Sequence, residues 1–187
     1  MRAGLNDTLN RGGPKQGGST ITQQLVKLNN NWAKDQTYTR KIKELILAME
    51  LERSYSKKEI LNGYLNAAPY GNIQYGVEVA ARDYFDKPAK DLTLAESVFL
   101  AAIPKSPSYY SPYGVLFKED PVVAAKDLKG RSEYILHIMK SEGMISQQQL
   151  DEAKKVDVLA TYKTPKPKFD GIKAPYFVLA AKEQLEV

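Results

Sequence analysis

A short segment near the start of the chain combines glycines, hydroxyl groups and amides in an order that suits anion binding. Residues 17–24 read Gly-Gly-Ser-Thr-Ile-Thr-Gln-Gln, and Lys27 follows one helical turn later. Two glycines let backbone N–H groups approach an anion, and a helix N-terminus adds the positive end of its dipole. Side-chain donors come from Ser19, Thr20, Gln23 and Gln24. The same pattern equally suits a flexible loop followed by an ordinary N-cap serine or threonine.

A second segment, residues 40–44, has the sequence Arg-Lys-Ile-Lys-Glu. On a helix Arg40 lies one turn before Glu44, and Lys41 lies three residues before it, so two cations flank one carboxylate. Such cations can hold a diphosphate, and the carboxylate can bind a divalent cation such as Mg²⁺ or Mn²⁺ or steer a proton. The alternative is an ordinary helix face with ion pairs. Either segment by itself is a weak signal.

Composition excludes several other kinds of site. The 187 residues contain no cysteine and one histidine, His137, which argues against disulfides, a thiolate metal site and a Ser-His-Asp hydrolase. The formal net charge is +5, which favours an anionic partner. The positive charge is dispersed, without a zinc-finger pattern or a basic helix, so we expect no nucleic acid partner. No apolar run approaches the roughly 20 residues of a membrane span.

The elements that must position these segments read as helices. Capping boxes begin at Ser56, Thr93 and Ser146, and no segment alternates in the manner of a strand. The pattern predicts an all-α protein with helices over residues 20–31, 39–53, 57–66, 76–84, 94–103, 119–142, 147–155 and 175–186. Helix 39–53 carries apolar residues on more than one face, so we expect it to be buried centrally.

Taken in order, several motifs resemble the family 51 glycosyltransferases, the peptidoglycan polymerase domains of class A penicillin-binding proteins. Residues 17–24 resemble the second motif of that family, and residues 40–44 resemble its third, RKxxE. Residues 59–66 and 75–85 are similar to the fourth and fifth motifs. The segments from Leu94 to Pro107 and from Ala174 to Phe177 also fit, so the resemblance covers nearly the whole chain.

The resemblance implies a lysozyme-like, multi-helix domain that joins lipid II units into glycan strands and releases undecaprenyl pyrophosphate. It implies that Glu44 assists catalysis near the phosphates, with a divalent metal as a candidate cofactor there. Substrate binding would fall to Ser19, Thr20, Gln23, Gln24, Lys27, Arg40 and Lys41. Its implied partners are lipid II, the growing glycan strand and an anionic membrane surface. In a full-length protein the resemblance implies the extracytoplasmic face of the inner membrane and a C-terminal transpeptidase domain.

One motif of the family has no counterpart here. The first motif, EDxxFxxHxG, carries the general-base glutamate and should precede residue 17, but that stretch contains no glutamate. We therefore expect residues 1–160 to form an N-terminally truncated glycosyltransferase domain with impaired catalysis. Residues 161–187 are expected to form an extended linker and the start of a following region. The alternative is a non-catalytic module that binds a lipid-linked pyrophosphate or glycan.

Overall fold

The computed structural model describes residues 18–32, 37–71 and 75–162, and within these ranges the regular secondary structure is helical. A single isolated bridge between Pro69 and Tyr75 is the β pairing recorded there. The prediction of an all-α fold is confirmed. The helix expected over residues 175–186 and the start of the chain before Gly18 lie outside the described residues.

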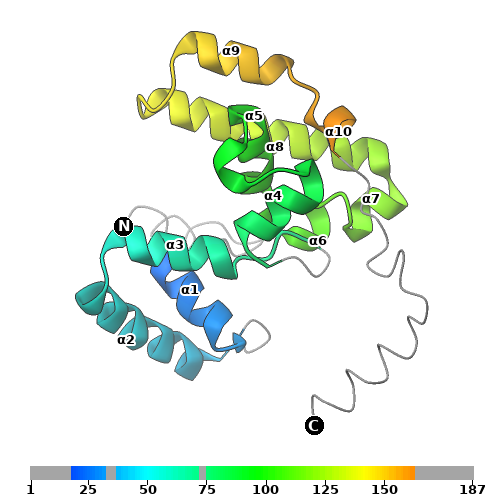
Figure 1. The fold of residues 1–187 in the computed structure, drawn as a ribbon. Helices are drawn as coiled ribbons and strands as arrows, with labels where there is room; N and C mark the ends of the chain where they lie inside the picture. Colours follow the sequence, from blue (N-terminus) through cyan, green and yellow to red (C-terminus); the bar gives the residue numbers. More distant parts are fainter. Residues whose placement is uncertain (1–17, 33–36, 72–74, 163–187) are drawn as a thin grey trace, which may run out of the picture.

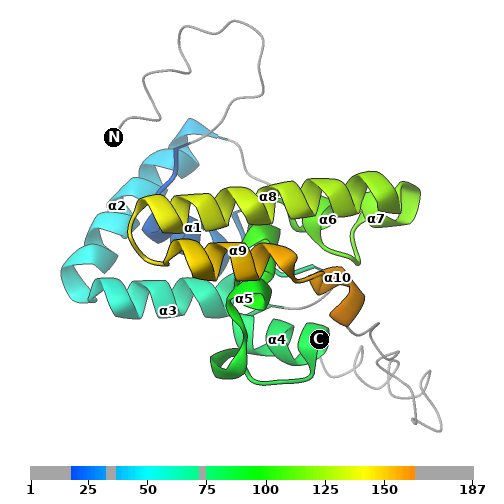
Figure 2. The same cartoon turned by 90° about the horizontal axis from the view of Figure 1, so that it is seen from above.

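The described helices form two groups (Figures 1 and 2). The first group comprises α1 (Ile21–Asn29), α2 (Tyr38–Ser54) and α3 (Lys57–Ala67), which pack against one another. The second group is built around the long helix α8. Its members are α4 (Val77–Phe85), η2 (Ala89–Asp91), α5 (Leu94–Ala102), η3 (Ile103–Lys105), α6 (Pro107–Tyr110), α7 (Val115–Glu119), α8 (Pro121–Ser141), α9 (Gln147–Lys155) and α10 (Val158–Thr161). Contacts between α3 and α4 join the two groups.

Local capping chemistry explains where most of these helices begin. The predicted capping boxes at Ser56, Thr93 and Ser146 are all formed, and Thr20 adds another at α1. Each satisfies two backbone donors that a helix start would otherwise leave without partners. The predicted helix over 119–142 begins later, as α8, because Asp120 caps it and Pro121 occupies its first position.

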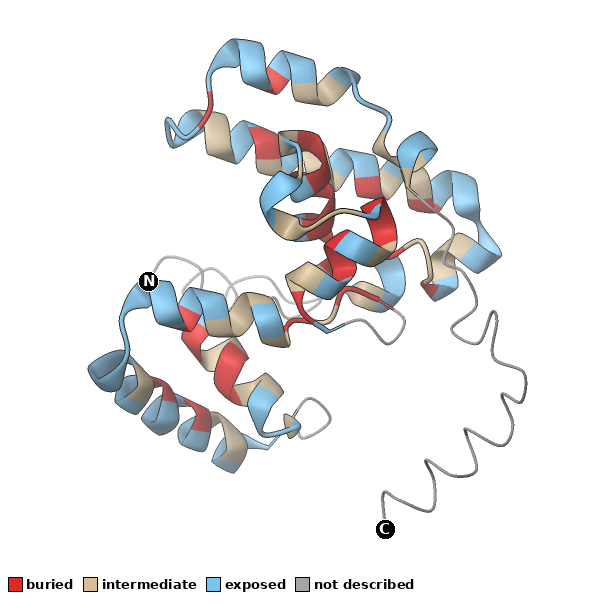
Figure 3. Ribbon diagram, in the orientation of Figure 1, coloured by how far each residue is buried: buried red, intermediate tan, exposed pale blue. Residues whose placement is uncertain are grey.

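Most of the apolar core lies in the second group. Its largest cluster surrounds Tyr84 and Phe99, whose rings meet edge to face with centroids 5.7 Å apart. A second, smaller cluster includes Val98 of α5 and Leu136 of α8. The first group buries much less apolar surface, chiefly Leu25, Val26, Ala48 and Ile60 (Figure 3).

The prediction that helix 39–53 is buried centrally is wrong. In α2 only Glu44 and Ala48 are buried, whereas Ile42, Leu45, Ile46 and Met49 are exposed. These four side chains and Tyr38 form a stripe on the side of the helix turned away from α1, which we call the α2 apolar stripe. Apolar content alone misled the prediction, because the part of the chain that the structure describes supplies no second layer to cover this face.

A buried polar cluster fixes the connection between the two groups. The Tyr84 hydroxyl donates to the Tyr70 carbonyl at 2.7 Å and shares a hydrogen bond of 2.8 Å with the Ser111 hydroxyl. Burial raises the pKa of Tyr70 to about 12, so its phenol stays neutral at physiological pH. The backbone after α3 is therefore held directly against α4 and the end of α6.

The described residues contain no helix that is both long enough and apolar enough to cross a bilayer. The domain boundary expected after residue 160 falls within α10, and residues 163–187 lie outside the described part. The division into a catalytic domain and a linker stays a prediction.

Candidate functional site

The first wall of the candidate site is the N-terminal turn of α1. The Thr20 hydroxyl caps this helix by accepting from the Gln23 amide at 3.2 Å, and the Gln23 side chain accepts from the Thr20 amide at 3.4 Å. Gln24 donates its side-chain amide to the Ser19 carbonyl at 3.3 Å. Thr20, Gln23 and Gln24 thus shape the helix start, and the ordinary N-cap role considered for this segment is confirmed at Thr20.

The second wall is the first two turns of α2, where Lys41 reaches across to α1. Its ammonium donates to the Ser19 hydroxyl at 2.7 Å, to the Gln23 side-chain oxygen at 3.3 Å and to Glu44 at 3.0 Å. Lys41 and Ser19 lie 22 positions apart in the sequence. The two segments that the sequence singled out therefore meet at one cationic centre.

Glu44 is the most deeply buried member of this cluster, with 1% of its side chain exposed. One carboxylate oxygen pairs with the Arg40 guanidinium and the other with the Lys41 ammonium. Two cations compensate the desolvation cost of burying one carboxylate. Without such partners, burial of the charged group would be strongly unfavourable. The cluster keeps one net positive charge, as an anion site requires.

Arg40 retains a donor without a protein acceptor. Its Nη1 binds Glu44, while its Nε is buried and has no hydrogen-bond partner among the described residues. A buried polar atom without a partner is costly, so it is a natural place for a ligand oxygen to bind.

Lys27 is the predicted site residue that the structure does not join to the others. It lies one turn after Gln23 on α1 and is half-buried, but no hydrogen bond or ion pair of the described residues connects it to the cluster. Lys27 therefore remains a predicted contact of substrate, whereas Ser19, Gln23, Arg40, Lys41 and Glu44 form one connected network.

A contact outside the predicted set fastens the two walls together. The hydroxyl of buried Thr22 donates to the Glu52 carboxylate at 2.7 Å, which ties α1 to the last turns of α2. Thr22 belongs to the motif at residues 17–24, but Glu52 follows it by 30 positions. The sequence held no signal for this pair, because its spacing matches no local pattern.

The divalent cation expected near Glu44 stays a prediction. Both carboxylate oxygens are occupied by cationic side chains, which repel a metal ion. The described residues also contain no group of three His, Asp or Glu side chains close enough to ligate one. This donor set fits an anion better than a divalent cation.

Comparison with known proteins identifies the family. The sequence model described as Transglycosylase matches residues 1–140, which include α1, α2 and the whole cluster. The chain belongs to the transglycosylase family. It is thus a glycosyltransferase domain, and the resemblance drawn from the motifs is confirmed.

Individual transglycosylase relatives agree over nearly the full chain. Penicillin-binding protein 2D of Bacillus subtilis is 43% identical over 171 residues, which are 91% of this chain and 23% of the relative. Penicillin-binding protein 1A of Pseudomonas aeruginosa is 37% identical over 185 residues, 99% of this chain and 21% of the relative. The chain therefore spans less than a quarter of the length of these two transglycosylase relatives.

A solved structure supports the fold of this transglycosylase domain. The 2.6 Å crystal structure of penicillin-binding protein 1A from Haemophilus influenzae superposes with a TM-score of 0.50 at 25% sequence identity. The match covers 88% of this chain and 20% of that one. The helical arrangement described above is thus similar to that of a penicillin-binding protein.

Proposed function

We propose that this transglycosylase domain polymerises lipid II into glycan strands and releases undecaprenyl pyrophosphate. The observation that carries the proposal is the network in which Lys41 of α2 binds Ser19, just before α1, and Gln23 of α1 as well as Glu44 of its own helix. Together with Arg40, it offers a partly buried, net positive site of the kind that a diphosphate group needs.

The reaction breaks and forms one bond each at the anomeric carbon of the donor sugar. The 4-hydroxyl of the acceptor attacks that carbon and loses its proton to a base. The bond from carbon to the diphosphate oxygen breaks, and its electron pair leaves with the diphosphate. Arg40 and Lys41 stabilise the negative charge that grows on this leaving group, and fixed cations in a partly buried site act strongly on such charge.

The hydrogen bonds of Lys41 indicate how a diphosphate would bind in the cluster. An ammonium has three N–H donors, and those of Lys41 are all used by Ser19, Gln23 and Glu44. A phosphate oxygen must therefore replace one acceptor, and the Gln23 oxygen at 3.3 Å is the most weakly held. The Arg40 Nε, which has no hydrogen-bond partner among the described residues, supplies a second donor once a small side-chain movement exposes it.

In this proposal, a divalent cation is bound by the diphosphate of the substrate. Glu44 is already paired with two cationic side chains, so we infer that Mg²⁺ or Mn²⁺ is carried by the diphosphate rather than by the protein. When bound there, the ion would add positive charge next to the leaving group. Pyrophosphate binding without metal, measured in a chelator, should then retain its dependence on Lys41.

The rate at which these 187 residues catalyse polymerisation is the subject of a separate proposal. Residues 1–16 contain no glutamate, so the general base that the family carries on its first motif has no counterpart in this stretch. Because a general base contributes about 10²- to 10⁴-fold, we expect slow polymerisation from these 187 residues. If the gene encodes the first motif upstream of residue 1, a version extended with those codons should polymerise lipid II faster by a similar factor.

The α2 apolar stripe supports a membrane surface as a further partner. Ile42, Leu45 and Met49 are each about half exposed or more, and Tyr38 is 90% exposed at the start of the helix. An apolar helix face beside basic residues is typical of helices that lie in a lipid interface, where lipid II is found. We propose that the domain works at the extracytoplasmic face of the inner membrane, and that a transpeptidase domain follows it in the full-length protein.

The second candidate is a module that binds a lipid-linked diphosphate without catalysis. The cluster favours it as much as it favours the enzyme, since the cluster supplies binding but not the missing base. Polymerisation by the extended version would exclude this candidate. Diphosphate binding without polymerisation in the extended version would support it.

Pyrophosphate titration of two matched variants tests the proposed site. Lys41→Gln removes a donor from the cluster, whereas Lys43→Gln removes the same charge from the exposed side of α2. Because hydrogen bonds to charged groups contribute about 1.5–3 kcal/mol, Lys41→Gln should weaken calorimetric binding by about tenfold or more. Lys43→Gln should change it by less than about threefold. Equal losses of pyrophosphate affinity in both variants would show that binding depends on general charge attraction and not on this site.

A further inference from the structure

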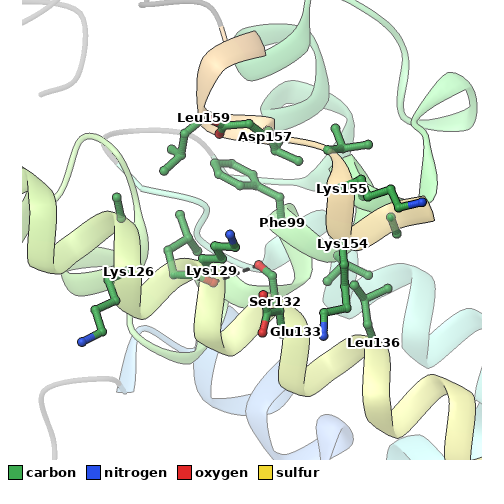
Figure 4. A pocket seen from close by; sticks show the side chains of 17 residues that line it. Phe99, Lys126, Lys129, Ser132, Glu133, Leu136, Lys154, Lys155, Asp157 and Leu159 are labelled. Atoms are coloured by element: carbon green, nitrogen blue, oxygen red, sulfur yellow. Dashed lines mark hydrogen bonds between the residues drawn. The ribbon is translucent and has the colours of Figure 1, made fainter. Parts of the chain in front are cut away.

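The second helical group contains a cavity that the proposed reaction does not use. It has a volume of about 440 Å³ and lies between α5, α8, α9 and α10 (Figure 4). The diphosphate cluster belongs to α1 and α2 in the other helical group (Figure 1). Two walls of the cavity, α9 and α10, lie beyond residue 140, where the family match ends.

The interior of this cavity is apolar. The buried side chains of Val98 and Phe99 of α5 and of Leu128 and Leu136 of α8 line its floor, and Leu159 of α10 adds a further apolar side chain. The Phe99 ring projects toward the middle of the space in Figure 4. Cavities of 300–1,000 Å³ with such linings are the usual size for small-molecule ligands. Its contents should therefore include a hydrocarbon portion.

The rim of the cavity carries an excess of positive charge. Four lysines line it against two carboxylates, those of Glu133 and Asp157. Asp157 caps α10 by accepting from the Ala160 amide, and the Ser132 hydroxyl donates to the Leu128 carbonyl at 2.9 Å. Lys129 of α8 and Lys154 of α9 stand on different sides of the opening, whereas Lys126 and Lys155 extend away from it (Figure 4).

We propose that this cavity binds a single-chain acyl carboxylate, with its chain on the apolar floor and its carboxylate between Lys129 and Lys154. The apolar floor selects for a hydrocarbon tail, because burial of apolar surface drives such binding. The lysine rim selects for an anionic head over a neutral or cationic one. The proposal is independent of the glycosyltransferase reaction, since it shares no residue with the diphosphate cluster.

Calorimetric titration with laurate below its micellar concentration tests the proposal on the whole 187-residue chain. The double variant Lys129→Gln/Lys154→Gln should weaken laurate binding about fivefold to tenfold, because each partly exposed ion pair makes a modest contribution. The matched double variant Lys57→Gln/Lys58→Gln removes the same charge from α3 and should leave binding within about twofold. Dodecyltrimethylammonium, with the same chain and a cationic head, should bind at least about tenfold more weakly.

Filling the cavity provides a second variant. Ala153 of α9 lines the space, so Ala153→Trp should abolish saturable laurate binding while circular dichroism reports an unchanged helical content. If Ala153→Trp fails to fold, the lysine pair and the cationic probe still decide. Absence of saturable binding would overturn the proposal, as would equal affinity for the two head groups or equal losses in the two lysine doubles. Binding of an acidic amphipathic peptide but not of laurate would instead assign the cavity to a protein partner.

Discussion

At the scale of single residues, the site depends on one carboxylate held between two cations. Glu44 is buried, while Arg40 and Lys41 keep partial access to solvent. Such an arrangement would be costly if it served stability alone, because well-packed apolar residues often stabilise a fold as well as a buried ion pair does. We therefore interpret the three residues as a reaction site, and Glu44 as the group whose charge matters during turnover.

The variant Glu44→Gln tests this interpretation with two readouts that should move in opposite directions. In the extended version of the chain, lipid II polymerisation should fall about 10²-fold or more, because the carboxylate acts in the reaction. In the 187-residue chain, pyrophosphate binding should become tighter by about fivefold, since a negative charge beside the ligand is removed. The amide oxygen keeps one of the two hydrogen bonds, but the NH₂ group turns a donor toward the other cation, so the melting temperature should fall by about 3–8 °C. Unchanged polymerisation with a lowered melting temperature would mark Glu44 as a structural ion-pair partner.

At the scale of elements, the turn after α3 determines how the two helical groups meet. Gly71 has φ +96°, and a Cβ added there would overlap the side chain of Ser111. Gly143, after α8, has φ +72° but open space around it. The two glycines thus share a backbone conformation that disfavours L side chains and differ in packing.

Alanine substitution at these two glycines separates strain from overlap. Gly143→Ala should cost about 1 kcal/mol, because the left-handed conformation alone is penalised. Gly71→Ala should cost about 3 kcal/mol or more, since overpacking against Ser111 adds to the same strain. Urea unfolding measures both values. Equal costs would mean that the Tyr84 and Ser111 cluster yields easily and does not fix the connection.

The start of α5 makes the stability of the fold depend on acid pH. Although burial acts to raise it, hydrogen bonds from Lys87 and Thr93 hold the pKa of Glu96 below its ordinary value of 4.5. A lowered pKa in the folded state means that the stabilisation is present above pH 4.5 and is lost as pH falls below that value.

The variant Glu96→Gln should therefore be less stable at pH 7 and should lose less stability on acidification. Hydrogen bonds to a charged group contribute about 1.5–3 kcal/mol, and we expect a cost near 1 kcal/mol at pH 7 because Lys87 is partly exposed. Chemical unfolding at pH 7 and pH 3 gives the comparison. A constant difference between the two proteins at both pH values would contradict this account.

At the scale of the whole molecule, the α2 apolar stripe is an apolar surface that the described residues leave uncovered. The net charge of +5 adds attraction to an anionic bilayer. Ile42 and Met49 lie on the stripe and are both 60% exposed, whereas Val122 and Met144 are equally exposed or more so on α8 and after it. The chain thus provides a matched pair of apolar positions on different faces.

Sedimentation with phosphatidylglycerol vesicles tests whether the stripe meets the membrane. Ile42→Glu/Met49→Glu should lower the partition coefficient by about tenfold or more, because two apolar contacts are lost and two repulsive charges are added. Val122→Glu/Met144→Glu adds the same charges away from the stripe and should lower it by less than about threefold. Equal decreases would show that net charge, rather than the stripe, controls vesicle binding.

The sequence alone determined where several helices begin and to which family the protein belongs. Capping boxes and helical spacing depend on residues three or four positions apart, so the starts at Ser56, Thr93 and Ser146 could be predicted directly. The ordered motifs likewise gave the family before any fold was known. These features are local because the hydrogen bonds that make them close within one helical turn.

Only the tertiary structure decided which surfaces are buried and which groups meet. It turned the apolar residues of α2 toward solvent, joined Lys41 to Ser19 and Gln23, left Lys27 outside the network, and tied Thr22 to Glu52. These outcomes depend on how α1 and α2 pack, and many helix arrangements are compatible with one pattern of apolar residues. A sequence pattern states which face of a helix is apolar, whereas the packed neighbours determine whether that face becomes core or surface.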